Sequence, residues 1–289
     1  MRLFPLRPGT GRLALAGAAL MLVSAGCDML SKPTEPGPIV TGGVSYTALG
    51  ASDAIGYGSS SPCIPFSACP DGAGYVQIVA RRLRATNPSL AFLNLGVPGA
   101  VLSREIMTIG NSLGRGIPAN MIDGQLPFVP NGSTIVTVFS DANGVNAIGA
   151  ALKPLAPGAR AAYGNTQIQN FARDFSGFIS GISGRAAGAT IIVLNLPNLA
   201  RLPYAAGYTE EERGYLRTLS AGFTAGMNAT RSAKVRVVDL MCHAQVYQPA
   251  FYSSDGFHPS DFGYSVMADL VSAAIAAPPS PPATTCSFM

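Results

Sequence analysis

Three residues that lie far apart in the chain have the types that nucleophilic catalysis needs. Ser52 follows a short apolar run in "YTALGASDAIGYG" (residues 46–58), and Asp255 and His258 stand three residues apart in "SSDGFHPSDFGYS" (residues 253–265). A serine hydroxyl is a weak nucleophile until a base takes its proton, and a carboxylate beside the imidazole orients that base. Ser52, His258 and Asp255 are therefore candidates for a Ser-His-Asp triad.

Each of these residues could also be an ordinary loop residue. Against that reading, Pro259, Ser260 and Asp261 give a helix a fixed start directly after His258, which would hold the histidine in place. His243 is the only other histidine in the chain, and its neighbour Cys242 indicates a structural setting. His258 is thus the better candidate for the base.

Apolar runs alternate with helical patterns along the chain. Five short runs rich in β-branched residues have the nearly continuous hydrophobicity of strands covered on both faces, at residues 44–50, 90–96, 134–140, 190–197 and 235–241. Helical spacing occurs between or after them, at residues 74–85, 166–187, 209–230 and 260–277. This alternation predicts an α/β fold with a parallel sheet and right-handed crossovers.

In such a sheet, ligands bind beyond the carboxyl ends of the strands. The loops that follow the first three predicted strands are small and polar, and they span residues 50–53, 96–100 and 141–144. Ser52 lies in the first of these loops. The loop is not a G-x-S-x-G nucleophile elbow, because Ala54 replaces the second glycine.

Residues 44–277 resemble the SGNH family, also called GDSL esterases and lipases. "GASDAIGYG" is similar to the serine block of that family, "NLGVPGA" to its glycine block and "DGFHPSDFGY" to its D-x-x-H block, while Asn143 falls where the third block carries asparagine. The last block is the most specific. The four blocks together, in order and at predicted strand ends, make the resemblance strong.

The resemblance implies a three-layer α/β/α sandwich around a parallel sheet of about five strands. It also implies a serine ester hydrolase that works through an acyl-enzyme without a cofactor, with Ser52 as nucleophile, His258 as general base and Asp255 as its partner. The oxyanion hole would consist of the Ser52 amide, the Gly99 amide and the Asn143 side chain. The substrate would be an ester of a small molecule, a lipid or a glycan.

The third block departs from the family pattern. It usually reads G-x-N-D, and here Asp141 and Gly144 occupy those positions as if exchanged. We expect Asp141 to bring a carboxylate close to a site that must stabilise negative charge. An alternative reason for glycine at position 144 is a positive φ there. Two alternatives to the hydrolase follow: an SGNH-fold protein that binds acyl or sugar ligands with little turnover, and a structural envelope lipoprotein.

The first residues form a targeting segment. An arginine-containing stretch precedes the apolar run "LALAGAALMLVSAGC", which resembles a bacterial lipobox ending at Cys27. This predicts a lipoprotein signal peptide over residues 1–27, lipidation of Cys27, a flexible tether over 28–43 and the hydrolase domain over 44–277, followed by a Pro-rich tail over 278–289. The protein would be exported and anchored to the membrane of the cell envelope, or else secreted.

The four remaining cysteines allow three pairings in an oxidising compartment. We favour Cys63 with Cys69, which closes a short loop, and Cys242 with Cys286, which would fasten the tail. A metal site is disfavoured because the chain has two histidines and no C-x-x-C motif. The net charge of +4 is spread without basic blocks, so no nucleic-acid partner is indicated.

Overall fold

The computed structural model describes residues 43–67 and 69–289. The predicted signal peptide with Cys27 and nearly all of the predicted tether lie outside the described residues.

Five parallel strands form one sheet in the order β2-β1-β3-β4-β5. Their bounds are β1 Ser45–Gly50, β2 Ala91–Asn94, β3 Ile135–Phe139, β4 Thr190–Leu194 and β5 Val235–Val238. The ladder register places Gly50 opposite Phe139, Phe139 opposite Leu194, and Leu194 opposite Val238. Four strands therefore end at one level, and the loops that follow them meet at one edge of the sheet. The predicted parallel α/β fold is confirmed.

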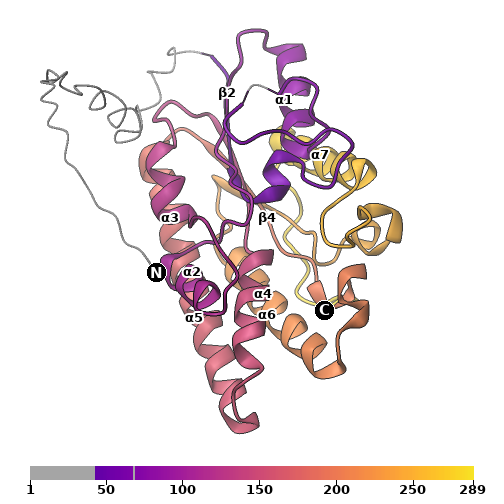
Figure 1. The fold of residues 1–289 in the computed structure, drawn as a ribbon. Coiled ribbons are helices and arrows are strands. Elements are labelled where there is room, and N and C mark those ends of the chain that lie inside the picture. The colour runs from indigo at the N-terminus through magenta and orange to yellow at the C-terminus, as the bar shows by residue number, and fades with distance from the viewer. Residues whose placement is uncertain (1–42, 68) are drawn as a thin grey trace, which may run out of the picture. The chain divides into compact units, whose positions relative to one another are not determined.

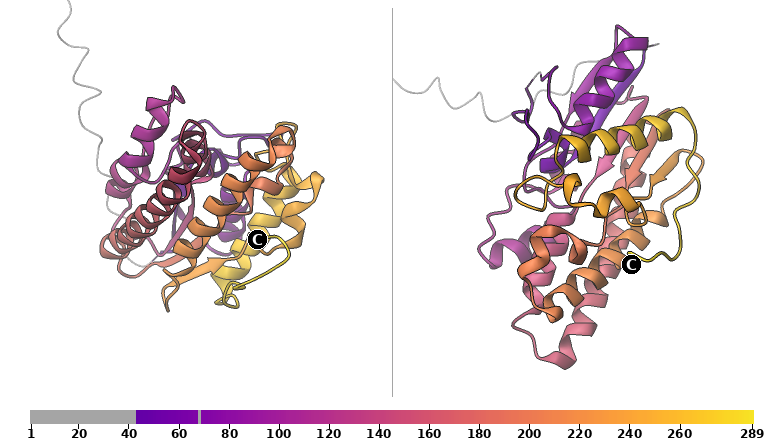
Figure 2. Two further views of the ribbon diagram at one scale, coloured as in Figure 1. Left: turned by 90° about the horizontal axis from the view of Figure 1, so that it is seen from below. Right: turned by 90° about the vertical axis from the view of Figure 1, so that its right-hand side faces the viewer.

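Helices cover both faces of this sheet. Their bounds are α1 Tyr75–Thr86, α2 Arg104–Ser112, α3 Met121–Gly124, α4 Ala142–Leu152, α5 Pro157–Arg185, α6 Glu210–Asn228 and α7 Asp261–Ala276. Helices α1 and α7 pack together on one face, while α4, α5 and α6 pack on the other with α2 against α4 (Figures 1 and 2). This is the three-layer sandwich that the resemblance implied.

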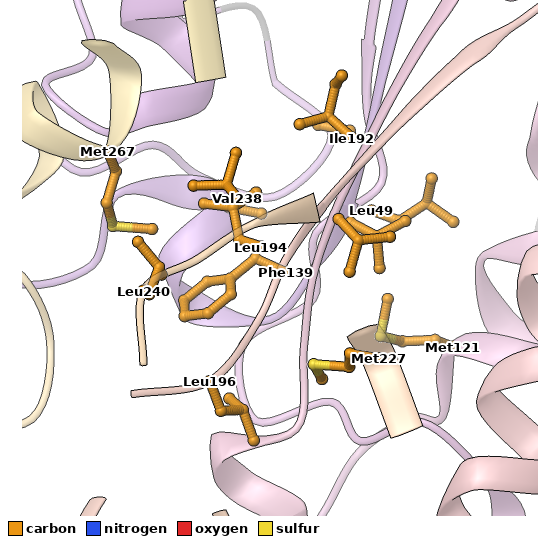
Figure 3. Packing of buried hydrophobic residues seen from close by; sticks show 14 of the residues in the cluster. Leu49, Met121, Phe139, Ile192, Leu194, Leu196, Met227, Val238, Leu240 and Met267 are labelled. Carbon is orange, nitrogen blue, oxygen red and sulfur yellow. The ribbon is translucent and has the colours of Figure 1, made fainter. Parts of the chain in front are cut away.

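The core is built from the apolar side chains that point from the two faces of the sheet. All residues of β1 and β3 are buried, which explains their unbroken hydrophobic sequence. Figure 3 shows Leu49, Ile192 and Met227 among the packed side chains. The edge strand β2 is only half-buried.

Helices α2 and α4, on the face opposite α1 and α7, were not predicted, and α5 is longer than expected. Helix α4 is rich in Gly and Asn, residues of low helix propensity, but it buries Val145, Ile148 and Leu152 against the core. Tertiary packing of this apolar face therefore outweighs the propensity of its sequence. Helix α5 begins at Pro157, nine residues before the predicted helix, because Pro is favoured at the first helical position.

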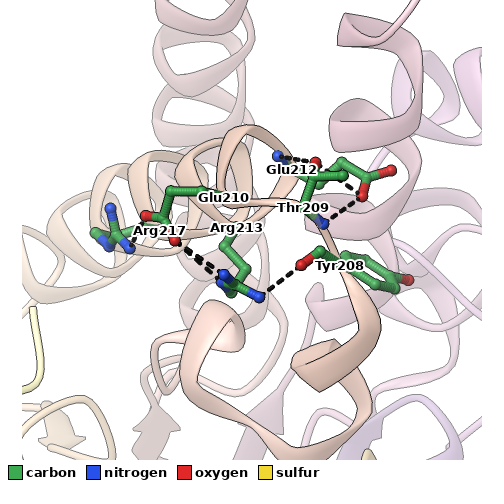
Figure 4. Close-up of polar contacts among 6 residues, drawn as sticks. All are labelled: Tyr208, Thr209, Glu210, Glu212, Arg213 and Arg217. Atoms are coloured by element: carbon green, nitrogen blue, oxygen red, sulfur yellow. Dashed lines mark hydrogen bonds and ion pairs between the residues drawn. The ribbon is translucent and has the colours of Figure 1, made fainter.

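The predicted start of α6 is held by a capping box. The Thr209 hydroxyl accepts from the Glu212 amide at 3.2 Å, and the Glu212 carboxylate accepts from the Thr209 amide at 2.9 Å (Figure 4). Ion pairs from Glu210 to Arg213 and Arg217 line the exposed side of the same turns. The local sequence thus fixes where this helix begins.

Both favoured disulfide bonds are present, Cys63–Cys69 and Cys242–Cys286. The second bond fastens the C-terminal tail, in which the Phe288 ring stacks on Tyr247 with centroids 4.3 Å apart and the Phe288 carbonyl accepts from Asn198 at 2.7 Å. Within residues 43–67 and 69–289, no helix has the length and apolar character of a membrane span.

Candidate active site

Ser52 lies just after β1, at the carboxyl edge of the sheet. It is the first residue of the short 3-10 helix η2 (Ser52–Ile55), which follows β1 after the single residue Ala51. Gly50, the last residue of β1, is held by the buried side chain of Gln125, which accepts from the Gly50 amide at 3.0 Å and donates to its carbonyl at 2.8 Å. This pair of bonds fixes the strand end from which Ser52 projects.

An unbroken hydrogen-bonded chain joins Ser52 to His258 and Asp255. Ser52 Oγ lies 2.8 Å from His258 Nε2, and His258 Nδ1 lies 2.6 Å from Asp255 Oδ2. With Asp255 ionised, Nδ1 carries the proton and Nε2 is free to accept from the serine hydroxyl. The structure therefore brings together the three residues predicted as a triad, across 206 positions of sequence between Ser52 and His258.

Asp255 is stabilised as a carboxylate. Burial alone would raise its pKa, but the His258 side chain, the amides of Phe257 and His258, and the Ser253 hydroxyl donate to it and lower the pKa to about 2. Asp255 is therefore ionised throughout the neutral range and accepts the Nδ1 proton of His258.

His258 is held from both sides. Its ring packs against Tyr57, with centroids 4.6 Å apart, and against Phe257 edge-to-face at 4.9 Å. Gly58, with φ of 90°, lies so close to His258 that a Cβ atom there would overlap the His258 side chain. The Tyr264 hydroxyl fixes this segment by donating to the Tyr57 carbonyl at 2.7 Å. The imidazole thus has little freedom to turn away from Ser52.

The backbone N–H groups of Ser52 and Gly99 have no acceptor among the described residues. Gly99 has φ of 78°, which glycine adopts without strain, and a Cβ atom there would press on Pro118. Asn143, in the first turn of α4, is bonded to the residue after Gly99, because its Nδ2 donates to the Ala100 carbonyl at 3.2 Å. The same Nδ2 keeps a second N–H that can donate. These are the three donors predicted for an oxyanion hole.

The exchanged third block has a steric explanation. Asp141, not Gly144, has the positive φ, 78°. Its buried carboxylate accepts from the Leu102 amide at 3.2 Å and occupies the space into which a Cβ atom at position 144 would point. A carboxylate at 141 and glycine at 144 therefore fit together. Asp141 therefore braces the glycine-block loop against α4.

The pKa of Asp141 is raised to about 7. Burial is the largest cause, and the hydrogen bonds from the Leu102 and Gly144 amides oppose it in part. Its second carboxylate oxygen has no hydrogen-bond partner in the described part of the chain. A fully charged carboxylate is thus disfavoured at this position up to neutral pH.

Several residues around the triad and the end of β1 were not predicted. Asp53, beside the nucleophile, is buried; burial raises the pKa of its carboxyl, and His258 opposes that rise. Tyr57 and Gln125 gave no recognisable sequence signal, because one acts by ring packing and the other by reaching the backbone of a distant strand. His243 lies after β5, where burial lowers its pKa, and it makes no contact with Ser52.

The described residues hold no group of three or more His, Cys, Asp and Glu side chains arranged to bind a metal ion.

The chain matches a known family over most of its length. The model of the GDSL-like lipase/acylhydrolase family matches residues 46–271, and this range includes the four blocks described above. No curated protein gives a significant match.

Solved structures share the fold. The lipase Lip_vut3 from a goat rumen metagenome is 19% identical, with a TM-score of 0.53 over 80% of this chain and 97% of that one. An extracellular lipase from Streptomyces rimosus is 18% identical and phospholipase A1 from Streptomyces albidoflavus NA297 is 16% identical, each with a TM-score of 0.53 over 80% of this chain and 99% of the other. At these identities the likeness is one of fold.

Proposed function

We propose that this chain, which belongs to the GDSL-like lipase/acylhydrolase family and is a carboxylic ester hydrolase, cleaves its substrates through an acyl-enzyme formed on Ser52. The observation that carries the proposal is the hydrogen-bonded chain from Ser52 through His258 to Asp255, with links of 2.8 and 2.6 Å. A further support is that Ser52 follows β1 at the carboxyl edge of the sheet, where parallel α/β proteins bind their ligands.

In the first half of the reaction, Ser52 Oγ attacks the ester carbonyl while His258 Nε2 takes its proton. Asp255 stabilises the imidazolium that results. The negative charge that develops on the carbonyl oxygen is met by the N–H groups of Ser52 and Gly99 and by the Asn143 amide. His258 then returns the proton to the departing alcohol, which leaves the acyl group on Ser52.

In the second half, water replaces the alcohol. His258 takes a proton from the water, the resulting hydroxide attacks the acyl carbonyl, and the same donors stabilise the second tetrahedral intermediate. Ser52 is released with the proton from His258, and the carboxylic acid departs. Every proton in this cycle passes through His258 Nε2, and no cofactor takes part.

A fluorophosphonate probe tests the proposed nucleophile. We expect labelling on Ser52 that depends on His258, and a loss of kcat on p-nitrophenyl butyrate on the order of 10⁴-fold or more in Ser52→Ala and in His258→Ala, with little further loss when the two are combined. His243→Ala is the matched control and should keep both labelling and turnover. Equal hydrolysis by the parent protein and Ser52→Ala would disprove the mechanism.

We further propose that the hydrolase domain, residues 44–277, is tethered to a membrane by a lipid on Cys27. The support is the lipobox-like sequence after a signal peptide over residues 1–27, followed by a Pro- and Gly-rich tether over 28–43. The two disulfide bonds fit an exported protein. Intact-mass measurement should find a mature chain that begins at diacylated Cys27, and Cys27→Ser should move the protein from the membrane to the soluble fraction. A different mature N-terminus would contradict this proposal.

A further inference from the structure

Strand β2 has main-chain groups on its outer side that face no other strand. It stands at the end of the sheet order, and in the described part of the chain β1 is its one strand partner. The amides of Ala91 and Leu95 donate to carbonyls of the β1 segment at 3.2 and 2.8 Å. Because successive residues of a strand point their N–H and C=O groups to opposite sides, those of Phe92 and Asn94 face away from the sheet. These two residues lie about 7 Å apart along the strand.

A hollow of about 500 Å³ lies beside this edge. β2 lines one side of it, and the loop closed by the Cys63–Cys69 bond lines another. Its volume is within the range of ligand-binding sites. We call this hollow the edge groove, and its lining residues include Phe66, Pro70, Arg84, Phe92, Leu93 and Asn94.

The walls of the edge groove are fastened to each other. The Arg81 guanidinium, on α1, donates to the carbonyls of Pro70 and Gly72 at 2.9 and 2.7 Å and so ties the disulfide loop to the helix. The Cys63–Cys69 bond closes the same loop. A groove with fixed walls binds a ligand without a further cost of ordering the loop.

Arg84, in the last turn of α1, is the one charged residue among those that line the edge groove. Its guanidinium lies over the Phe92 ring, 5.4 Å from the centroid. No ion pair of the described chain includes Arg84, whereas Arg82 on the same helix pairs with Asp269 at 2.6 Å. A guanidinium stacked on a ring keeps its N–H groups for a planar acceptor, and a carboxylate matches them best. The groove therefore favours a ligand that carries a carboxylate.

The main chain of β2 indicates the kind of ligand that carries this carboxylate. The outward N–H and C=O groups of Phe92 and Asn94 have the spacing of a strand, which a second extended chain matches and a small anion does not. We infer that the edge groove binds an extended peptide segment of another protein, which adds a strand to β2 and places an acidic side chain against Arg84. None of the triad residues lines this groove, so the site is additional to the proposed active site.

Two other occupants fit the edge groove less well. A second copy of the chain would offer its own β2, whose sequence AFLN contains no acid to meet Arg84. Residues 28–42 of the same chain include Glu35, but Pro33, Pro36 and Pro38 lack the N–H that a paired strand donates. A segment of a different protein is therefore the occupant that satisfies both the charge and the main chain.

Peptide binding tests the charge that the edge groove selects. The probe is a fluorescein-labelled peptide of alternating threonine and valine with one central glutamate, and fluorescence polarisation measures its Kd. Exchanging that glutamate for glutamine should raise the Kd of the parent protein about fivefold or more and leave the Kd of Arg84→Gln unchanged. Arg82→Gln, on the same helix, is the matched control and should distinguish the two peptides as the parent does.

Hydrogen exchange locates the bound peptide and needs no variant. The amides of Phe92 and Asn94 should exchange more slowly when the peptide is bound, because they then donate to its carbonyls. The Leu95 amide already donates to the Ala48 carbonyl, so its exchange should not change. Binding without protection of the Phe92 and Asn94 amides would overturn the inference.

Three other results would also contradict the inference. The first is an absence of binding at millimolar peptide, which is also the result expected if residues 28–42 of the same chain fill the edge groove. The second is an equal preference for the glutamate peptide in the parent and in Arg84→Gln. The third is a dimer in sedimentation that the peptide dissociates, which would assign the groove to a second copy. None of these measurements depends on ester hydrolysis, so they test the groove separately from the proposed function.

Discussion

At the scale of single residues, Asp141 shows how a departure from a family pattern can preserve a local arrangement. Its carboxylate lies where a side chain at position 144 would point, and it accepts from the Leu102 amide. The exchange of aspartate and glycine therefore keeps a carboxylate beside the glycine-block loop. It also leaves that carboxylate buried with one unpaired oxygen, which has consequences for stability.

We predict that Asp141→Asn changes the pH dependence of stability. Burial raises the pKa of Asp141 from 3.8 to about 7 in the folded chain, so between these values the folded state holds a proton that the unfolded state has released. Stability from this group is therefore present below pH 4 and declines as the pH rises towards 7. Asparagine tolerates a positive φ, keeps an acceptor for the Leu102 amide and carries no charge.

Thermal unfolding at pH 5 and pH 8 measures the effect. The Tm of Asp141→Asn relative to the parent should rise by roughly 3–10 °C from the lower to the higher pH. Asp269→Asn, a change at an exposed carboxylate on α7, is the control and should show no such rise. A difference that is the same at both pH values would mean that Asp141 is charged in the folded protein throughout this range.

At the scale of elements, the site depends on short segments that fix the ends of strands. Helix α3 has only four residues, and Gln125 directly after it bonds both the amide and the carbonyl of Gly50. One side chain thus serves as a partner for the end of β1, two residues before the proposed nucleophile. A buried amide that loses this partner has no water to replace it.

We predict that Gln125→Leu costs more than an ordinary core substitution. The change leaves the buried Gly50 amide without a partner, at about 1–3 kcal/mol, and removes one of the two bonds to the Gly50 carbonyl, which still accepts from the Val97 amide. It also releases the strand end that carries Ser52. Urea unfolding should show a loss of about 2–4 kcal/mol, and fluorophosphonate should label the folded protein more slowly.

The matched control is Gln167→Leu, at a second buried glutamine on α5 whose Oε1 has no partner in the described chain. It should cost little and leave the labelling rate unchanged. Equal effects of the two substitutions would show that the bonds to Gly50 have no special role.

At the scale of the whole molecule, the C-terminal tail is bonded to the loops that follow β4 and β5. The Ala283 amide donates at 2.9 Å to Asp239, which follows β5, and Arg201 donates at 2.6 Å to the Ser287 carbonyl. The Cys242–Cys286 bond spans 44 residues, against six for Cys63–Cys69. Covalent closure of a longer segment restricts the unfolded chain more.

We predict that the two disulfide bonds contribute unequally to stability. On the chain-entropy estimate, Cys242→Ala/Cys286→Ala should lower the free energy of unfolding by about 4 kcal/mol and Cys63→Ala/Cys69→Ala by about 2 kcal/mol. Urea unfolding of the two double variants measures the difference. The reverse order would mean that native contacts of the loops, rather than loop closure in the unfolded chain, determine the contribution of each bond.

Much of this protein is already determined by its sequence. The five strands were predicted because continuous β-branched runs are the local signature of strands buried on both faces, and α6 was predicted from the helical spacing of residues 209–230. The position of Ser52 also followed, since it comes directly after the first predicted strand and ligands bind beyond the carboxyl ends of parallel strands. His258 follows no strand directly, so its pairing with Ser52 was predicted from the residue types of the triad.

Only the tertiary structure decided features that depend on which distant groups meet. Helix α4 forms because its apolar face is buried, despite a sequence rich in Gly and Asn. Nothing in the local sequence shows that Gln125 reaches Gly50, or that the Asp141 carboxylate turns to Leu102. Phe66 is exposed although its residue type predicts burial, because a proline turn inside a disulfide loop holds it outward. Hydrophobic periodicity reports the burial of whole elements, whereas single partners are chosen by the space that packing leaves between them.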